Sequence, residues 1–371
     1  MNNVMEEKII FTTGGTGGHI YPALAIAKEF KKRGSSILFV GTKHRMEREI
    51  VPNEGYDFIG LDVLPLRSIK SFIKMLKAIK EALRIVKNEK PTKVIGFGNY
   101  ISIPILVAAK IKKIPYYLQE QNSTMGMANR YFYKGSQKTF LAFENTLDNI
   151  VPKYKGKFVV TGNPLREKIY SIDKYIEREN AGGTHKFLGL SQIRNFKFMS
   201  PNMEEQLKIG RIFKHIDNNN QGILKNLEKI TIENNIKLFW GTGKENYDEI
   251  NGRIRKRHNL IVKPYFENAA EIMAASDLVI SRAGASTISE LIQLEKPALM
   301  IPYDFVGQKE NADVLEFVNG GKMYTNDEVQ EAIEEAICLI KEPDMLEFMG
   351  LNIKSIKKGN ATENIIKNME E

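Results

Sequence analysis

The sequence has a single cysteine, Cys338, and no long hydrophobic run among its 371 residues. One cysteine excludes a framework of disulfides within the chain and is typical of a protein from a reducing compartment. No apolar run approaches the ~18 residues that a membrane-spanning helix needs. The first ten residues, MNNVMEEKII, carry acidic side chains and lead directly into an apolar stretch, unlike a signal peptide. We therefore expect a soluble or peripheral protein.

Side chains arranged for metal binding or nucleophilic catalysis are also scarce. The five histidines show no spacing typical of metal ligands, and no Asp-X-Asp pair follows a predicted strand. The Gly-X-Ser-X-Gly motif of many hydrolases is missing too. We therefore expect neither a metal ion nor another cofactor.

Apolar residues, 42% of the chain, are plentiful enough for the cores of two α/β domains. Short β-rich runs alternate with helical patterns in both halves, which predicts parallel sheets covered by helices. Ligands then bind at the carboxyl ends of the strands. The predicted strands are residues 9–11, 37–41, 94–97, 116–118, 158–161, 237–240, 260–262, 278–280 and 298–301; the predicted helices include 21–33, 103–110 and a charged helical end, 326–371.

The most informative segment joins the first predicted strand to the first helix and reads TTGGTGGHIYPALAIA, residues 12–27. Its glycines allow a ligand to approach the backbone, and a helix N-terminus offers N–H groups to an anion. His19 is placed to act as a base there. An alternative is a tight turn with a capping histidine. The spacing fits neither a P-loop nor the dinucleotide-binding fingerprint.

The excess positive charge, +9 for the whole chain, is concentrated in residues 67–90, where eight Lys or Arg oppose two Glu. Large apolar residues recur there at steps of three and four, typical of one helical face. Ile73 and Met75 lie off that face, so the beginning of the helix is more widely apolar than a buried stripe requires. The residues predicted on the face are Ile69, Phe72, Leu76, Ile79, Leu83 and Val86.

Two interpretations of this basic helix remain open. It suits the surface of an anionic membrane, with Phe72, Ile73 and Met75 in contact with lipid beside Lys70 and Lys74. It also fits an ordinary surface helix whose apolar face lies in the core. No stacking aromatics or nucleic-acid-binding motif accompany the charge, so we expect no nucleic acid partner.

Three further motifs follow predicted strands. Gln-Glu-Gln-Asn, ending at Asn122, is either a polar loop or part of a site. Arg166, in GNPLRE, suits bidentate binding of a diphosphate, although it could be a plain surface arginine. SRAGASTISE, residues 281–290, places Ser286 and Thr287 at a helix N-terminus that could bind phosphates. Thr287 and Glu290 also have the spacing of a capping box.

These motifs, in this order, resemble the bacterial N-acetylglucosaminyltransferases of the MurG type, which convert lipid I to lipid II. The resemblance covers roughly residues 8–180 and 236–345. It implies the GT-B fold, with two Rossmann-like α/β domains facing a cleft. We predict an acceptor- and membrane-binding domain over residues 1–163, a UDP-sugar-binding domain over 164–345, and a final helix over 346–371 that returns to the first domain.

The resemblance also implies an activity: inverting transfer of N-acetylglucosamine from UDP-N-acetylglucosamine to the 4-hydroxyl of undecaprenyl-linked lipid I. The enzyme would act as a peripheral protein on the cytoplasmic face of the membrane, with cell-wall synthesis proteins as candidate partners. His19 is the candidate base, and Asn122 faces the donor sugar. The other residues implied at the substrates are Thr16, Gly17, Gly18, Arg166, Ser191, Phe266 (through its backbone, at the uracil), Ala285, Ser286, Thr287, Glu290 (at the ribose) and Gln308 (at the donor sugar).

The resemblance ends in residues 187–222, where a strand followed by Gly-Gly-Ser is expected and FLGLSQIR stands instead. Ser191 is the candidate for the serine of that motif. Residues 303–307 also depart from the family pattern. Three alternatives therefore stay open: another lipid-directed or secondary-metabolite GT-B transferase, a UDP-sugar epimerase, and an impaired homologue that binds without turnover.

Overall fold

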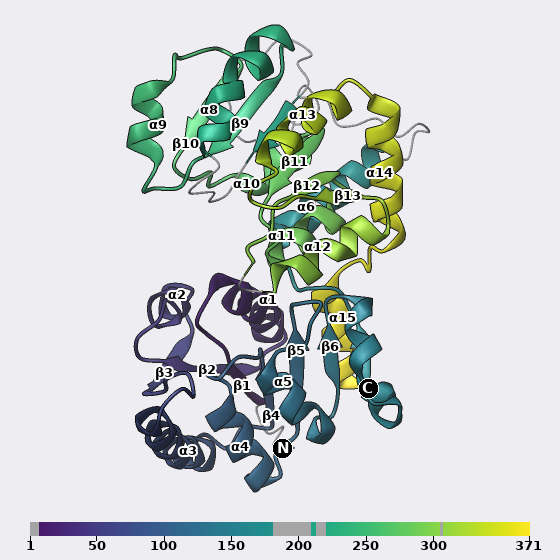
Figure 1. Ribbon diagram of the computed structural model, residues 1–371. Helices are drawn as coiled ribbons and strands as arrows, with labels where there is room; N and C mark the ends of the chain where they lie inside the picture. Colours follow the sequence, from purple (N-terminus) through teal and green to yellow (C-terminus); the bar gives the residue numbers. More distant parts are fainter. Residues whose placement is uncertain (1–6, 181–208, 213–219, 305–306) are drawn as a thin grey trace. The chain divides into compact units, whose positions relative to one another are not determined.

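The structure, a computed structural model, describes residues 7–180, 209–212, 220–304 and 307–371. The chain divides into two compact units. The first contains residues up to Arg166 together with Lys358–Glu371, and the second spans Glu167–Lys357 (Figure 1). The returning segment is shorter than the predicted 346–371 because α14 (Pro343–Ser355) buries Leu346 and Met349 in the core of the second unit.

The first unit is built on a seven-stranded sheet of order β3-β2-β1-β4-β5-β6-β7. Its strands are β1 (Lys8–Thr12), β2 (Ser36–Thr42), β3 (Asp57–Leu61), β4 (Lys93–Gly96), β5 (Tyr116–Glu120), β6 (Thr139–Leu141) and β7 (Phe158–Val160). Every neighbouring pair is parallel. All the strands therefore direct their carboxyl ends to one edge, where the Gly-rich loop follows β1.

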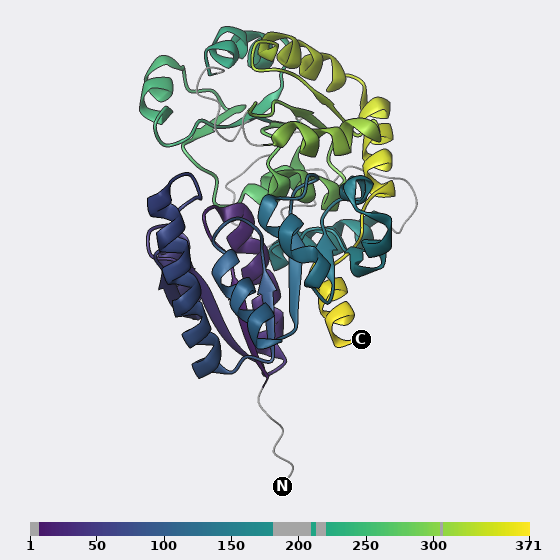
Figure 2. The same cartoon turned by 60° about the horizontal axis from the view of Figure 1, so that its bottom comes forward.

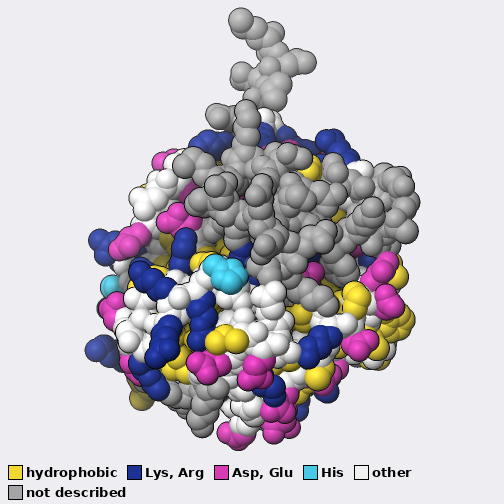
Figure 3. Space-filling model, turned by 90° about the horizontal axis from the view of Figure 1, so that it is seen from above, with side chains coloured by type: hydrophobic (Ala, Val, Ile, Leu, Met, Phe, Trp, Pro, Cys, Tyr) yellow, Lys and Arg dark blue, Asp and Glu magenta, His cyan; other side chains and the backbone are white. Residues whose placement is uncertain are grey.

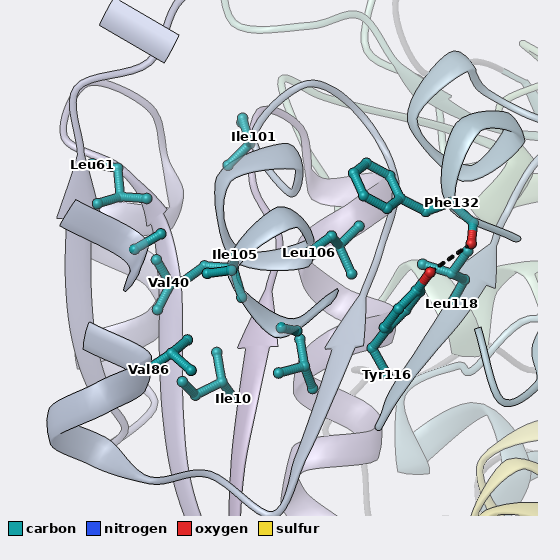
Figure 4. Close-up of a cluster of buried hydrophobic side chains, with 14 of the residues drawn as sticks. Ile10, Val40, Leu61, Val86, Ile101, Ile105, Leu106, Tyr116, Leu118 and Phe132 are labelled. Carbon is teal, nitrogen blue, oxygen red and sulfur yellow. Dashed lines mark hydrogen bonds between the residues drawn. The ribbon is translucent and has the colours of Figure 1, made fainter. Parts of the chain in front are cut away.

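Helices cover both faces of this sheet, because alternate residues of its strands point to opposite sides. Ile10 belongs to the cluster under α3 (Ile69–Glu89) and α4 (Ile103–Lys112), whereas its neighbours Ile9 and Phe11 belong to the cluster under α1 (Gly17–Lys32) and α15 (Ala361–Glu370). Figure 4 shows part of the first cluster, in which the Tyr116 hydroxyl donates a hydrogen bond of 2.9 Å to the Phe132 carbonyl. The helices are α1 (Gly17–Lys32), α2 (Glu47–Asn53), α3 (Ile69–Glu89), α4 (Ile103–Lys112), α5 (Met127–Phe132) and α15 (Ala361–Glu370).

The buried face of α3, the long helix that Figure 2 shows lying along the sheet, differs from the prediction. It consists of Ser71, Met75, Ala78, Ala82, Ile85 and Val86. Met75 is only 3% exposed, so its predicted contact with lipid is wrong. Ile69, Phe72 and Leu76 are exposed, which excludes the interpretation that places them in the core and agrees with the predicted exposure of Phe72. Alanines allow α3 to approach α4 closely, and such small residues mark a core face only weakly in the sequence.

The second unit has a six-stranded sheet of order β10-β9-β8-β11-β12-β13, parallel in every described pair. Its strands are β8 (Ile209–Ile212), β9 (Lys237–Gly241), β10 (Leu260–Lys263), β11 (Leu278–Ser281), β12 (Ala298–Met300) and β13 (Gly321–Met323). Its helices are α6 (Glu167–Asn180), α8 (Asn220–Glu228), α9 (Tyr247–Arg253), α10 (Ala269–Ala275), α11 (Ala285–Gln293), α12 (Gln308–Phe317), α13 (Val329–Leu339) and α14.

The nine predicted strands are all present, and β3, β6, β8 and β13 were not predicted. The helices at the end of the chain are confirmed as α13, α14 and α15. Within the described part of the chain, none of the helices has the length and apolar character needed to cross a bilayer.

Candidate active site

The Gly-rich loop of the first unit connects β1 directly to α1. The helix begins at Gly17, four residues before the predicted start, and Thr16 is its N-cap. Gly17 and Gly18 are thus the first two helical residues, and their N–H groups have no carbonyl one turn earlier to bond. Gly15 has a φ of 91°, in the left-handed region that favours glycine. The loop therefore presents backbone donors at the carboxyl end of β1.

His19 lies in the first turn of α1, where neighbouring threonine hydroxyls contact its ring and its backbone carbonyl. Its Nδ1 is 3.0 Å from the Thr16 hydroxyl, and the Thr13 hydroxyl donates a 2.8 Å hydrogen bond to its carbonyl. Burial lowers the pKa of His19 to about 4, although the charge of Glu47 opposes this shift. The imidazole is therefore neutral at physiological pH. If Nδ1–H donates to Thr16, Nε2 carries the lone pair that can accept a proton.

Two residues that the sequence analysis did not single out hold this loop. The fully buried carboxylate of Glu47 accepts hydrogen bonds from the Gly15 N–H at 3.0 Å and from the Thr42 N–H at 2.9 Å. On the other side, the Asn99 amide donates to the Gly14 carbonyl at 2.6 Å. Glu47 lies more than thirty residues from the loop in sequence, and only the pairing of β1 with β2 brings it there.

A buried carboxylate also organises the segment after β5. One oxygen of Glu120 accepts from the Asn122 backbone N–H at 3.1 Å and from its side-chain amide at 3.2 Å. The other accepts from Gly126 N–H and the Asn129 amide, both at 2.9 Å. Burial raises the pKa of Glu120, and these hydrogen bonds oppose the rise. The orientation of Asn122 is thus set by Glu120. The segment is an ordered hydrogen-bond network around a buried carboxylate rather than an ordinary surface loop.

In the second unit, the helix that follows β11 begins at Ala285 with Gly284 as its N-cap. Ser286 and Thr287 therefore lie half-buried in its first turn, at the carboxyl end of the strand, and Glu290 lies one turn further on. The predicted capping box is wrong, since Thr287 is the third helical residue and Gly284 has no side chain to cap the helix. The first-turn N–H groups and hydroxyls remain in place for an anion.

The beginning of α12 lies against the same edge of the second sheet. The Gln308 side-chain oxygen accepts a hydrogen bond of 3.1 Å from the Tyr303 N–H. The Asn311 amide donates to the Ala283 carbonyl at 3.3 Å, which ties α12 to the turn before α11. Gln308 and the α11 N-terminus are therefore parts of one local arrangement.

The remaining predicted residues are placed as follows. The Phe266 side chain is 5% exposed and packs on Phe239, with ring centroids 6.2 Å apart, so a ligand could meet only its backbone. Arg166 is exposed and is the last residue of the first unit's longer segment. Ser191 lies outside the described residues.

A group of three carboxylates in the second unit has the spacing of a cation site, but a lysine lies among them. Asp173, Glu177 and Glu295 each place an oxygen near the others. The Lys357 ammonium is 2.5, 3.2 and 2.9 Å from them, respectively. This cluster is therefore an ion-pair network.

Basic side chains that the sequence analysis did not single out are exposed at the end of α9 and in the loop after it, Arg255 and Lys256 among them. Figure 3 shows Lys and Arg gathered beside a histidine on its left, the side on which Figure 1 draws α9. Nearby carboxylates neutralise part of this charge, since Arg253 pairs with Glu249 at 3.1 Å. We assign no site to this surface.

Comparison with protein families gives two matches in sequence order. The glycosyltransferase family 28 N-terminal domain matches residues 9–141, and its C-terminal domain matches residues 215–368. A third match, to the type I restriction modification DNA specificity domain, covers residues 165–234. That range includes residues 187–222, where the resemblance noted in the sequence ends.

Comparison with individual proteins points to one enzyme. The chain is 42% identical to the UDP-N-acetylglucosamine--N-acetylmuramyl-(pentapeptide) pyrophosphoryl-undecaprenol N-acetylglucosamine transferase of Fusobacterium nucleatum, over 98% of each chain. It is 31% identical to the transferase of that name from Caldanaerobacter subterraneus, over 96% of this chain and 98% of the relative. Among solved structures, MurG of Acinetobacter baumannii matches 98% of the chain with a TM-score of 0.73 at 21% identity. The prediction of two Rossmann-like domains of the GT-B class is thus confirmed.

Proposed function

Because the chain belongs to the MurG family of N-acetylglucosamine transferases, within glycosyltransferase family 28, we propose that it makes lipid II. It transfers N-acetylglucosamine from UDP-N-acetylglucosamine to the 4-hydroxyl of the muramyl-pentapeptide of lipid I. The observation that carries this proposal is the 42% identity over 98% of the chain, which spans both domains. Membership of this family also argues against the epimerase alternative.

We assign binding of the donor, UDP-N-acetylglucosamine, to the second unit. The half-buried first turn of α11 supports binding of the diphosphate by Ser286, Thr287 and the N–H group of Ala285. Glu290, one turn later, accepts from the ribose hydroxyls, and Gln308 contacts the hydroxyls of the sugar. The uracil meets the backbone at Phe266, whose side chain is buried.

The reaction is a direct displacement at the anomeric carbon, which inverts its configuration. The lipid I 4-hydroxyl oxygen forms the new bond to that carbon as the bond to the UDP oxygen breaks. His19 takes the hydroxyl proton, a role supported by its neutral state and by the Thr16 contact to Nδ1. General-base help of this kind contributes ~10²–10⁴ in rate. Arg166, Ser286 and Thr287 stabilise the charge on the departing UDP.

We assign binding of the lipid I diphosphate to the first unit. Thr16, Gly17 and Gly18 lie where α1 begins, so their backbone donors suit the lipid diphosphate or the charge that develops in the reaction. Asn122, oriented by Glu120, faces the donor sugar. Ser191 stays a predicted substrate-binding residue, as the candidate for the serine of the Gly-Gly-Ser motif.

The beginning of α3 is assigned to the cytoplasmic membrane surface. Phe72 and Ile73 are 56% and 48% exposed, and Lys70 is exposed beside them. Lys74 pairs with Asp62 at 2.8 Å, so its charge is partly neutralised. An exposed apolar strip flanked by lysines suits an anionic bilayer surface.

The test is transfer of radiolabelled N-acetylglucosamine from its UDP donor to a lipid I analogue, by purified full-length protein in the presence of EDTA. We expect lipid II as the product, and a His19→Ala variant with turnover lowered ~10²–10⁴-fold but donor affinity little changed. Glu49→Gln, an exposed position on α2, is the matched control. Binding of UDP without product would instead support an impaired homologue or another acceptor.

A further inference from the structure

The Glu47 side chain occupies a space that two glycines leave open for it. A Cβ atom at Gly14 would lie 2.4 Å from a Glu47 carboxylate oxygen, and one at Gly41 would lie 2.7 Å from its Cγ. The side chain thus passes from α2 between the ends of β1 and β2. Any larger residue at either glycine would displace the Glu47 side chain. The two glycines are therefore needed to accommodate this buried carboxylate.

The position of this carboxylate is hard to explain by stability alone. Burying an ionised carboxylate is costly, and well-packed apolar residues often serve stability as well or better. Both carboxylate oxygens of Glu47 accept hydrogen bonds from backbone N–H groups, at Gly15 and Thr42. These groups lie at the carboxyl ends of adjacent strands. Glu47 therefore fixes one loop conformation, at the edge of the sheet where the reacting groups are assigned.

Asn99 supports the loop from the opposite side. Its amide donates to the Gly14 carbonyl at 2.6 Å, while its side-chain oxygen accepts from the Ile101 N–H at 2.7 Å. A Cβ atom at Gly15 would lie 3.2 Å from the Asn99 amide nitrogen. The peptide units of Gly14 and Gly15 are therefore clamped between two side chains, four residues before His19.

We propose that Glu47 is a positioning residue for the transfer reaction: it holds the Gly14–Gly15 backbone, and through it the first turn of α1 that carries His19. Asn99 is the second support. The catalytic consequence rests on the proposed function, whereas the effect on the loop does not. Displacing a reacting group by about 1 Å can cost ~10²-fold in rate, which sets the size of the expected effect.

The test uses Glu47→Gln in the full-length protein, with Glu49→Gln as control. Glutamine keeps the shape but turns an N–H donor toward one of the two backbone N–H groups and removes the charge. We expect kcat for lipid II formation to fall ~10–10²-fold, with KM for UDP-N-acetylglucosamine nearly unchanged and the melting temperature lowered by only a few degrees through the one backbone N–H left unpaired. Hydrogen exchange of the peptide that contains Gly15 should speed up, and the His19 pKa, followed by NMR, should fall further.

Two results would overturn the proposal. One is unchanged kcat together with unchanged exchange at Gly15. The other is a loss of kcat that tracks an equal loss of UDP binding and melting temperature, which would make Glu47 merely structural. If the native protein makes no lipid II, the proposed function fails, and hydrogen exchange with the His19 titration still decides whether Glu47 holds the loop.

Discussion

The low pKa of His19 leads to a quantitative prediction about stability. Burial lowers the pKa from 6.5 to about 4 in the folded protein. Between these two values the unfolded chain binds the proton and the folded chain does not. Protonation of His19 therefore does not affect the free energy of unfolding above about pH 6.5. The free energy of unfolding decreases as the pH falls from there toward 4.

The size of the effect follows from the two pKa values. At about pH 5, the unfolded state gains ~2 kcal/mol from protonation of His19 that the folded state does not share, whereas at about pH 7.5 the difference is close to zero. A His19→Gln variant lacks the titrating group. Its first unit should therefore lose ~2 kcal/mol less stability than the native unit when the pH is lowered from 7.5 to 5.

Each unit offers its own measurement. Hydrogen exchange of peptides from β1 and α1 reports the opening of the first unit, and the fluorescence of Trp240, the single tryptophan, reports unfolding of the second. The variant should differ from the native protein only in the first. His258→Gln, at an exposed position of the second unit, is the control. If native protein and His19→Gln lose stability in parallel, His19 titrates normally, and the argument for a neutral base held by the loop is refuted.

Three further predictions concern other parts of the chain. Replacing Phe72 and Ile73 by serine should weaken binding to anionic vesicles in a sedimentation assay, with little change in melting temperature because both side chains are exposed. Met75→Ala should do the opposite, with vesicle binding retained and unfolding in urea ~2–5 kcal/mol easier, since Met75 lies in the core. Lys357→Met should destabilise the second unit by ~3–5 kcal/mol, measured by Trp240 fluorescence, because it removes the cation shared by three carboxylates and leaves, among the described residues, only Lys354, 3.9 Å from Glu295, near them.

The predicted strands were found because they are apolar runs bounded by turn residues, and two of the missed strands, β8 and β13, lack that signal. β13, Gly321–Met323, contains a glycine and an exposed lysine, and it is a strand only through its pairing with β12. β8, Ile209–Ile212, is central to its sheet but lies within residues 187–222, where the resemblance ends. Residues 187–194, which stand where the resemblance implies a strand followed by Gly-Gly-Ser, lie outside the described residues.

The face of α3 was misread for a similar reason. Large apolar residues at helical spacing left a core stripe open as one interpretation, but the stripe in the structure contains Ala78 and Ala82, which contribute little to such a pattern. The surface that receives α3 is its neighbour α4, and close helix packing selects small residues. The sequence alone could not show which of two overlapping apolar stripes a partner helix would cover.

The candidate site likewise contains residues that a local sequence pattern identifies and residues that only the fold brings there. Thr16 to His19, and Ala285 to Glu290, are contiguous segments at a strand end and a helix start, so their sequence predicts both their structure and their place at a ligand. Glu47, from α2, and Asn99, from the turn after β4, act on the first segment from elsewhere in the fold, and no local pattern marks them. A loop with this many glycines has many accessible conformations, and selecting one requires contacts from outside it. The supports of a glycine-rich site are therefore the residues that a linear motif omits, and a structure is needed to find them.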